Sequence, residues 1–253
     1  DVTWDGKAYH QEAIAALANG GNPYRIGWIG ASENSIWIAC YPKFSWAYGA
    51  SMVRLTGLME SAKSLSLLVP LAAGLVCWSI LCSWNLAPVW AALGAGLAVG
   101  NPVILVQVHS SYVDGIMAAL LIVLVGCLCS LWRQENREAL LGAVVSLILL
   151  INIKLTGLVY GVCLSLVFVV VSAKWRINAL SRRTLWGLIA AGLLGVLLWG
   201  WDPYVTNWRD HGHPLYPAGG TDLLAQATES MRPADLNEQI GRASCRERVC
   251  YVV

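Results

Sequence analysis

The sequence predicts an all-α, polytopic integral membrane protein. Of its 253 residues, 57% are hydrophobic and only 13% are charged, whereas a soluble domain carries about 25% charged residues. Its mean hydropathy is +0.58. Thirteen Trp and nine Tyr stand against two Phe, which is typical of chains rich in membrane–water interface, where amphipathic rings gather. The net charge of +2 gives no reason to expect a nucleic-acid partner.

The opening stretch, residues 1–62, is the densest polar segment, and we expect it to form a long extracytoplasmic loop with interfacial helices. Asp5 and Gly6 open a first helix, and Gly20 with Gly21 closes it. One face of that helix is predicted from residues at helical spacing, namely Tyr9, Ala13, Ala16 and Leu17.

A second helix is expected to begin at Pro42, after an extended stretch over residues 32–42 (SENSIWIACYP). Its inner face is predicted from four residues at helical spacing, Trp46, Ala50, Val53 and Gly57. Because this region also carries Lys43, Arg54 and Glu60, we expect the helix to lie at the interface rather than to span the bilayer.

Residues 63–201 are predicted to form a bundle of about six transmembrane helices. A span needs about 20 apolar residues, and apolar stretches cover residues 64–83, 86–108, 113–132 and 185–201. The run over residues 139–171 is too long for one helix and is interrupted by Asn152, Lys154 and Gly157. We therefore expect two short helices to meet there, and we expect Pro70 and Pro102 to kink their helices.

Basic residues predict the orientation of the spans. Arg133 and Arg137 follow the third span, and a second basic group follows the fifth, namely Lys174, Arg176, Arg182 and Arg183. Both loops lie on the same side of the membrane. The positive-inside rule assigns this side to the cytoplasmic face of the cell (inner) membrane. The other side receives residues 1–62, residues 109–114, the Lys154 turn and everything after residue 201. All four His and the conspicuous Asp residues then share one extracytoplasmic face, which predicts an active site there.

Asp5 is the leading candidate for a general base. A helix N-terminus favours the ionised form of a carboxyl just ahead of it, and that carboxylate can accept a proton. The alternative is an ordinary N-cap. Asp1 either binds substrate or is a solvated loop residue. Asp114 begins the third span near His109, and it either lines a substrate site or caps the helix.

Lys154 is the leading candidate for a phosphate-binding cation. A charge within a span raises the free energy of membrane insertion by about 2.5–3.5 kcal/mol on insertion scales. This lysine therefore either binds a ligand or extends its side chain to the headgroups. Arg25 and Arg54 are alternative phosphate ligands, because a guanidinium offers two donors at once. The alternative for both is a solvated surface position.

Residues 202–239 are expected to form a second extracytoplasmic loop. Its His211 and His213 are candidate substrate contacts, or ordinary neutral loop histidines. An H-x-H pair alone predicts no metal, and the sequence contains no C-x-x-C pair. We expect no metal site and no required cofactor, and the use of a divalent metal is left open.

The two ends of the sequence suggest a fragment. The chain starts at Asp1 rather than Met, so we expect a preceding membrane helix to be missing. Residues 240–249 (IGRASCRERV) resemble a translated sequencing adapter. We therefore expect residues 240–253 to be a non-native tail, the alternative being a genuine basic tail.

Three short motifs resemble those of the C-type (GT-C fold) membrane glycosyltransferases that use polyprenyl-phosphate sugars. This family includes the protein mannosyltransferases and the aminoarabinose transferases of lipid A. Residues 4–14 (WDGKAYHQEAI) resemble the family's first extracytoplasmic loop, with Asp5 and Tyr9 at matching positions. Gly6 departs from the pattern, because the family has a second acidic residue there.

The other two motifs follow in the same order as in the family. Residues 41–49 (YPKFSWAYG) are similar to its Tyr-Pro helix start, and residues 152–157 (NIKLTG) resemble its basic turn. In layout the resemblance covers residues 4–201.

The resemblance implies transfer of a sugar from a polyprenyl-phosphate donor to a lipid, glycan or protein acceptor outside the cytoplasm. Asp5 would be the base, and Lys154, with Arg25 and Arg54 as alternatives, would bind the donor phosphate. The residues proposed to contact substrate are Asp1, Tyr9, His10, His109, Asp114, His211 and His213. Two other classes are a transporter or lipid flippase, which often shows repeats and mid-membrane charges, and a non-catalytic membrane scaffold.

Overall fold

The chain folds into helices, as its composition predicts. The computed structural model describes residues 6–22, 35–134, 136–175 and 182–216, and no strand occurs among them. Four segments are long and apolar enough to cross a membrane, namely Met59–Ser83, Asp114–Arg133, Leu155–Trp175 and Arg182–Trp199. The all-α membrane class is therefore confirmed. The predicted count of six spans is not, since four segments of the described chain meet the criteria of length and hydropathy.

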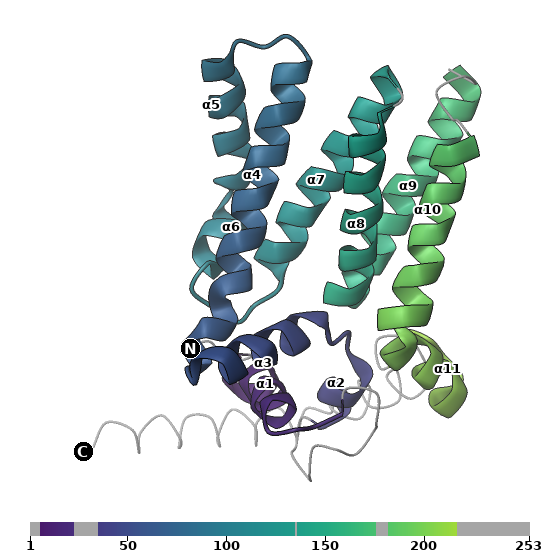
Figure 1. The fold of residues 1–253 in the computed structure, drawn as a ribbon. Coiled ribbons are helices and arrows are strands. Elements are labelled where there is room, and N and C mark those ends of the chain that lie inside the picture. The colour runs from purple at the N-terminus through teal and green to yellow at the C-terminus, as the bar shows by residue number, and fades with distance from the viewer. Residues whose placement is uncertain (1–5, 23–34, 135, 176–181, 217–253) are drawn as a thin grey trace, which may run out of the picture.

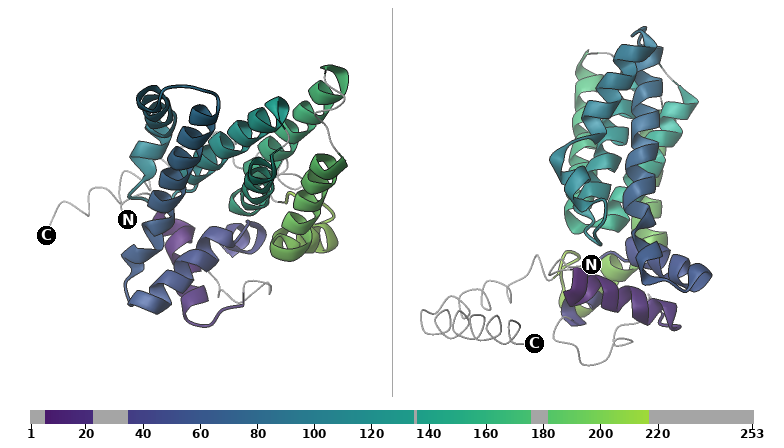
Figure 2. Two further views of the ribbon diagram at one scale, coloured as in Figure 1. Left: turned by 45° about the horizontal axis from the view of Figure 1, so that its top comes forward. Right: turned by 90° about the vertical axis from the view of Figure 1, so that its left-hand side faces the viewer.

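The described residues form an upright helix bundle with a smaller lobe at one end (Figure 1, Figure 2). The bundle holds α4 (Leu65–Ser83), α5 (Pro88–Val99), α6 (Pro102–Gln107), α7 (Asp114–Arg133), α8 (Arg137–Ile153), α9 (Leu155–Trp175) and α10 (Arg182–Leu194). The lobe holds α1 (Gln11–Ala18), α2 (Ser35–Cys40) and α3 (Phe44–Thr56), and α11 (Thr206–His211) lies at the same end. A 3-10 segment, η2 (Met59–Ser64), leads from the lobe into α4.

The lobe is held together by an apolar core from its three short helices. That core consists of Ala13, Ile14, Leu17, Ile38, Trp46 and Ala50. A π-helical turn, η1 (Gly6–His10), precedes α1. After α1 the chain turns at Gly20, whose φ of 97° lies in the left-handed region that favours glycine. The predicted first helix is therefore confirmed, with Ile14 rather than Ala16 completing its buried face.

The prediction of an extended stretch over residues 32–42 is wrong for the part that the structure describes, because Ser35–Cys40 form α2. A short apolar run does not separate helical from strand periodicity, and burial of Ile38 and Cys40 in the lobe favours the helix. The helix expected after Pro42 is confirmed as α3, with Trp46 and Ala50 buried as predicted. Gly57 does not share this buried face, because it follows the helix as an exposed cap with a φ of 74°.

The prediction of a single span over residues 86–108 is wrong, because the chain breaks there into α5 and α6. The Asn101 side chain causes this break by capping α6. Its Oδ1 accepts a hydrogen bond from the Ile104 backbone N–H at 3.1 Å, and its Nδ2 donates to the Ala98 carbonyl at 3.0 Å. Pro102 starts α6, where its missing N–H costs nothing. By contrast, Pro70 lies inside an unbroken α4.

The predicted interruption of the run 139–171 is confirmed at Lys154. This residue separates α8 from α9 and has extended backbone angles, φ −156° and ψ 148°. The two helices pack closely beside the turn, because a Cβ at Gly157 would clash with the Leu150 carbonyl oxygen. Neither helix is short, since α8 has 17 residues and α9 has 21.

Candidate functional site

Three connecting segments or helix ends of the bundle lie at the end that carries the lobe (Figure 1). They are the start of α7, the α8–α9 turn and the segment that follows α10. A hollow of about 20 Å³ between the lobe and the bundle is lined by Trp46, Lys63, Ser110 and Ser111, among others. The polar stretches that are far apart in sequence therefore meet at one end of the molecule.

Lys154 and Asp114 form an ion pair at this end. Lys154 Nζ lies 2.5 Å from Asp114 Oδ1, which joins the α8–α9 turn to the first residue of α7. The two side chains are 25% and 32% exposed, so a ligand can reach them. An incoming anion would compete with Asp114 for the ammonium group.

Two helix N-termini add positive potential around this pair. Asp114 is the first residue of α7, and Leu155, directly after Lys154, is the first residue of α9. The first turn of a helix carries partial positive charge and N–H groups without partners inside the helix. The site therefore has one ammonium group and two helix N-termini but only one carboxylate. This excess of positive charge favours the binding of a second anion.

His10 connects the lobe to the same charges. Its imidazole is 3% exposed, and its Nδ1 accepts a hydrogen bond from Trp46 Nε1 at 2.7 Å, so the neutral ring carries its proton on Nε2. The pKa of His10 is lowered to about 4, chiefly by burial and further by the charge of Lys154, while Asp114 opposes this shift. His10, Asp114 and Lys154 therefore share one electrostatic environment.

The lowered pKa of His10 predicts a loss of stability on acidification. The unfolded chain takes up a proton near pH 6.5, whereas the folded chain does so only near pH 4. Stability from this residue is thus full above pH 6.5 and is lost as the pH falls towards 4. Between pH 7.5 and pH 5 the loss amounts to about 2 kcal/mol. Apparent unfolding midpoints in detergent, followed by tryptophan fluorescence, measure it.

The matched variants for this experiment are His10→Gln and His109→Gln, because His109 is exposed. We expect His10→Gln to flatten the dependence of the midpoint on pH and His109→Gln to leave it unchanged. An equal drop on acidification in His10→Gln and the wild type would show that His10 is not responsible.

A second ion pair, fully buried, ties the lobe to the segment after α10. Lys43 Nζ lies 3.0 Å from Asp202 Oδ2, with side chains 5% and 1% exposed. The ammonium group also donates to the Ala39 and Tyr41 carbonyls at 2.8 and 3.2 Å, and Asp202 Oδ1 accepts from Thr206 Oγ1 at 2.9 Å. Burial lowers the pKa of Lys43, and Asp202 opposes this shift. The pair is a structural connection, with little room for a ligand.

The remaining predicted site residues of the described chain lie in varied settings. The Arg54 guanidinium donates to the Leu17 and Ala18 carbonyls at 2.9 and 2.8 Å, which caps the end of α1. The Tyr9 ring lies beside the His10 ring, with centroids 4.4 Å apart and an interplanar angle of 36°. His109 is exposed between α6 and α7.

The two histidines of the predicted second loop make local contacts, and the first of them, His211, is the last residue of α11. His211 stacks on Tyr216 at 4.0 Å, and His213 Nδ1 accepts a hydrogen bond from the Leu215 N–H at 3.2 Å. In the described part of the chain no three His, Cys, Asp or Glu residues are grouped so that they could hold a metal ion.

The structure brings together His10, Asp114 and Lys154, and it does not describe Asp1, Asp5 or Arg25. The roles of these last three remain sequence predictions. Sequence reasoning missed the partnership of Lys43 with Asp202. A signal for it was present, because each charge stands beside a proline in an otherwise apolar context, at 42–43 and 202–203.

In comparisons with known proteins, no family model, curated protein or solved structure matches this chain significantly.

Proposed function

We propose that this chain is an integral membrane glycosyltransferase that transfers a sugar from a polyprenyl-phosphate donor to an acceptor on the extracytoplasmic side. The observation that carries the proposal is the meeting of His10, Asp114 and Lys154 at one end of the bundle. They come from three distant segments, and the charges of Lys154 and Asp114 both act on His10.

The arrangement suits departure of a phosphate. In the proposed reaction an acceptor hydroxyl or amine attacks the anomeric carbon, and the bond from that carbon to the donor phosphate oxygen breaks. The polyprenyl phosphate leaves as a weak base, so no strong general acid is required. Lys154 and the adjacent helix N-termini would stabilise the charge that develops on it.

The proton released by the acceptor needs a base. We assign this role to Asp5, which precedes His10 by five residues in the sequence. Attack from the side opposite the leaving phosphate would invert the anomeric configuration. Tyr9 and His10, from the same segment, would contact the substrates.

The test is a transfer assay in proteoliposomes. The wild-type protein is supplied with a panel of polyprenyl-phosphate sugars, including mannose and aminoarabinose donors, and with bacterial membrane extract as acceptor. We expect release of polyprenyl phosphate coupled to incorporation of the sugar. In Asp5→Asn we expect the transfer to be lost while insertion into the bilayer and donor binding persist.

The same assay separates the competing classes. A flippase would move the donor between leaflets without releasing polyprenyl phosphate, and a scaffold would do neither. Either result would overturn the proposed reaction, whereas transfer by Asp5→Asn at the wild-type rate would remove only Asp5 as the base.

A further inference from the structure

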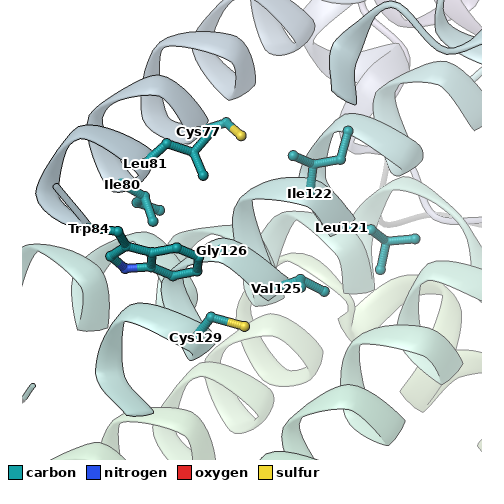
Figure 3. Close-up of a pocket in the computed structure, with 9 residues that line it drawn as sticks. All are labelled: Cys77, Ile80, Leu81, Trp84, Leu121, Ile122, Val125, Gly126 and Cys129. Atoms are coloured by element: carbon teal, nitrogen blue, oxygen red, sulfur yellow. The ribbon is translucent and has the colours of Figure 1, made fainter. Parts of the chain in front are cut away.

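A second feature lies at the opposite end of the bundle, away from the lobe. An apolar groove of about 390 Å³ runs between α4 and α7 (Figure 3). Its walls come from Cys77, Ile80 and Leu81 of α4, from Trp84 directly after that helix, and from Leu121, Ile122, Val125, Gly126 and Cys129 of α7. The small side chains of Cys77 and Cys129 leave the space that forms the groove, whereas Ile80 packs against Gly126.

The groove is long enough for most of an acyl chain within one leaflet. Residues 77–84 and 121–129 each cover roughly 10–12 Å along their helices at 1.5 Å per residue. One leaflet contributes roughly half of the 30 Å hydrocarbon core. Both helices belong to segments that qualify as membrane spans, so the groove faces the hydrocarbon region.

A positive charge is fixed at the end of the groove. Arg133 is one helical turn beyond Cys129, and its guanidinium carbon lies 5.4 Å from the centre of the Trp84 ring. The carbonyl ends of α4 and α7 lie here too and carry partial negative charge. Because these helix ends repel an anion, the positive charge of Arg133 is what would attract a headgroup anion at this level. The following loop carries Glu135, Arg137 and Glu138, so its two carboxylates are balanced only when Arg133 and Arg137 are counted together.

A hydrogen-bond donor at the same place has no partner. Within the described part of the chain, Trp84 Nε1 is buried and makes no hydrogen bond. A buried N–H without a partner costs about 1–3 kcal/mol. A phosphate oxygen placed between Trp84 and Arg133 would satisfy both groups.

We propose that this groove binds one acyl chain of an anionic glycerophospholipid, whose phosphate contacts Arg133 and Trp84. The lipid belongs to the leaflet opposite the lobe. This site is separate from the proposed sugar-transfer site, and it stands whether or not that transfer occurs.

Native mass spectrometry of the delipidated protein tests the proposal. The protein is titrated with dioleoyl-phosphatidylglycerol or with dioleoyl-phosphatidylcholine, which have the same acyl chains but differ in net charge. We expect one phosphatidylglycerol to bind about 10-fold more tightly than phosphatidylcholine, because the choline ammonium of phosphatidylcholine offsets the negative charge that its phosphate presents to Arg133. We expect Arg133→Ala to abolish that preference and Arg137→Ala, four residues further along, to retain it.

The groove itself is tested by Cys129→Phe, which fills it, against Cys129→Ala, which leaves it open. We expect Cys129→Phe to weaken binding of both lipids and Cys129→Ala to bind as the wild type does. Equal affinity for the two lipids in the wild type would overturn the proposal, as would an equal loss in Arg133→Ala and Arg137→Ala. A dimer that Cys129→Phe dissociates would assign the groove to a second copy of the chain and overturn it too.

Discussion

Replacing Lys154 by alanine is expected to lower sugar transfer by about 10²–10³-fold, the loss typical when one group that stabilises developing negative charge is removed. Lys154 is the cation of the Asp114 pair and is 25% exposed, so it is both fixed in place and open to a ligand. If it binds the donor phosphate, its loss must weaken donor binding more than acceptor binding.

Binding of undecaprenyl phosphate, compared with uncharged undecaprenol, isolates the phosphate contact. We expect Lys154→Ala to reduce affinity for the phosphate form and leave affinity for the alcohol unchanged, while Lys154→Arg retains part of the difference. Asp114→Asn is the matched control. It removes the competing carboxylate, so binding of the phosphate form should persist or strengthen. If Lys154→Ala bound undecaprenyl phosphate with wild-type affinity, Lys154 would have only a structural role in its ion pair with Asp114.

Breaking the buried Lys43–Asp202 pair is expected to cause the largest loss of stability. Removing one partner of such a pair costs about 3–5 kcal/mol, because the other charge remains buried without compensation. We therefore expect Lys43→Met to lower the apparent unfolding midpoint by roughly 6–20 °C, using 2–4 °C per kcal/mol for a chain of this size. Tryptophan fluorescence in detergent measures the midpoint.

Two controls accompany this variant. Lys43→Met combined with Asp202→Asn removes both charges and should recover most of the loss, since Asn can still accept the Thr206 hydrogen bond. Lys63→Met breaks the pair of Lys63 with Glu60, which is 68% exposed, and should cost less than about 1 kcal/mol. Similar midpoints in Lys43→Met and Lys63→Met would contradict a structural role for the buried pair.

Sequence patterns predicted the helices best where a long apolar run coincides with a real span. The helices α4 and α7 begin and end within one or two residues of the predicted stretches 64–83 and 113–132. Average hydropathy failed over residues 86–108, because the break depends on one Asn101 side chain that caps α6. Local periodicity failed at α2, because a short apolar run does not separate helix from strand and the burial of two residues favours the helix.

In the candidate site, too, the sequence predicted individual residues but not their partners. The break at Lys154 and the acidic start of α7 were both visible in the sequence, because a charge within an apolar run is rare. Their pairing was not visible, since 40 residues separate them and only the packing of α7 against α8 and α9 brings them together.

Hydrophobicity and charge are properties of single residues, so the order of amino acids is enough to identify a helical membrane protein and its conspicuous polar residues. The partners of those residues follow from the fold: Asp114 for Lys154, Trp46 for His10 and Asp202 for Lys43. A buried charge or donor must be satisfied, and the group that satisfies it comes from whichever segment the fold places nearby.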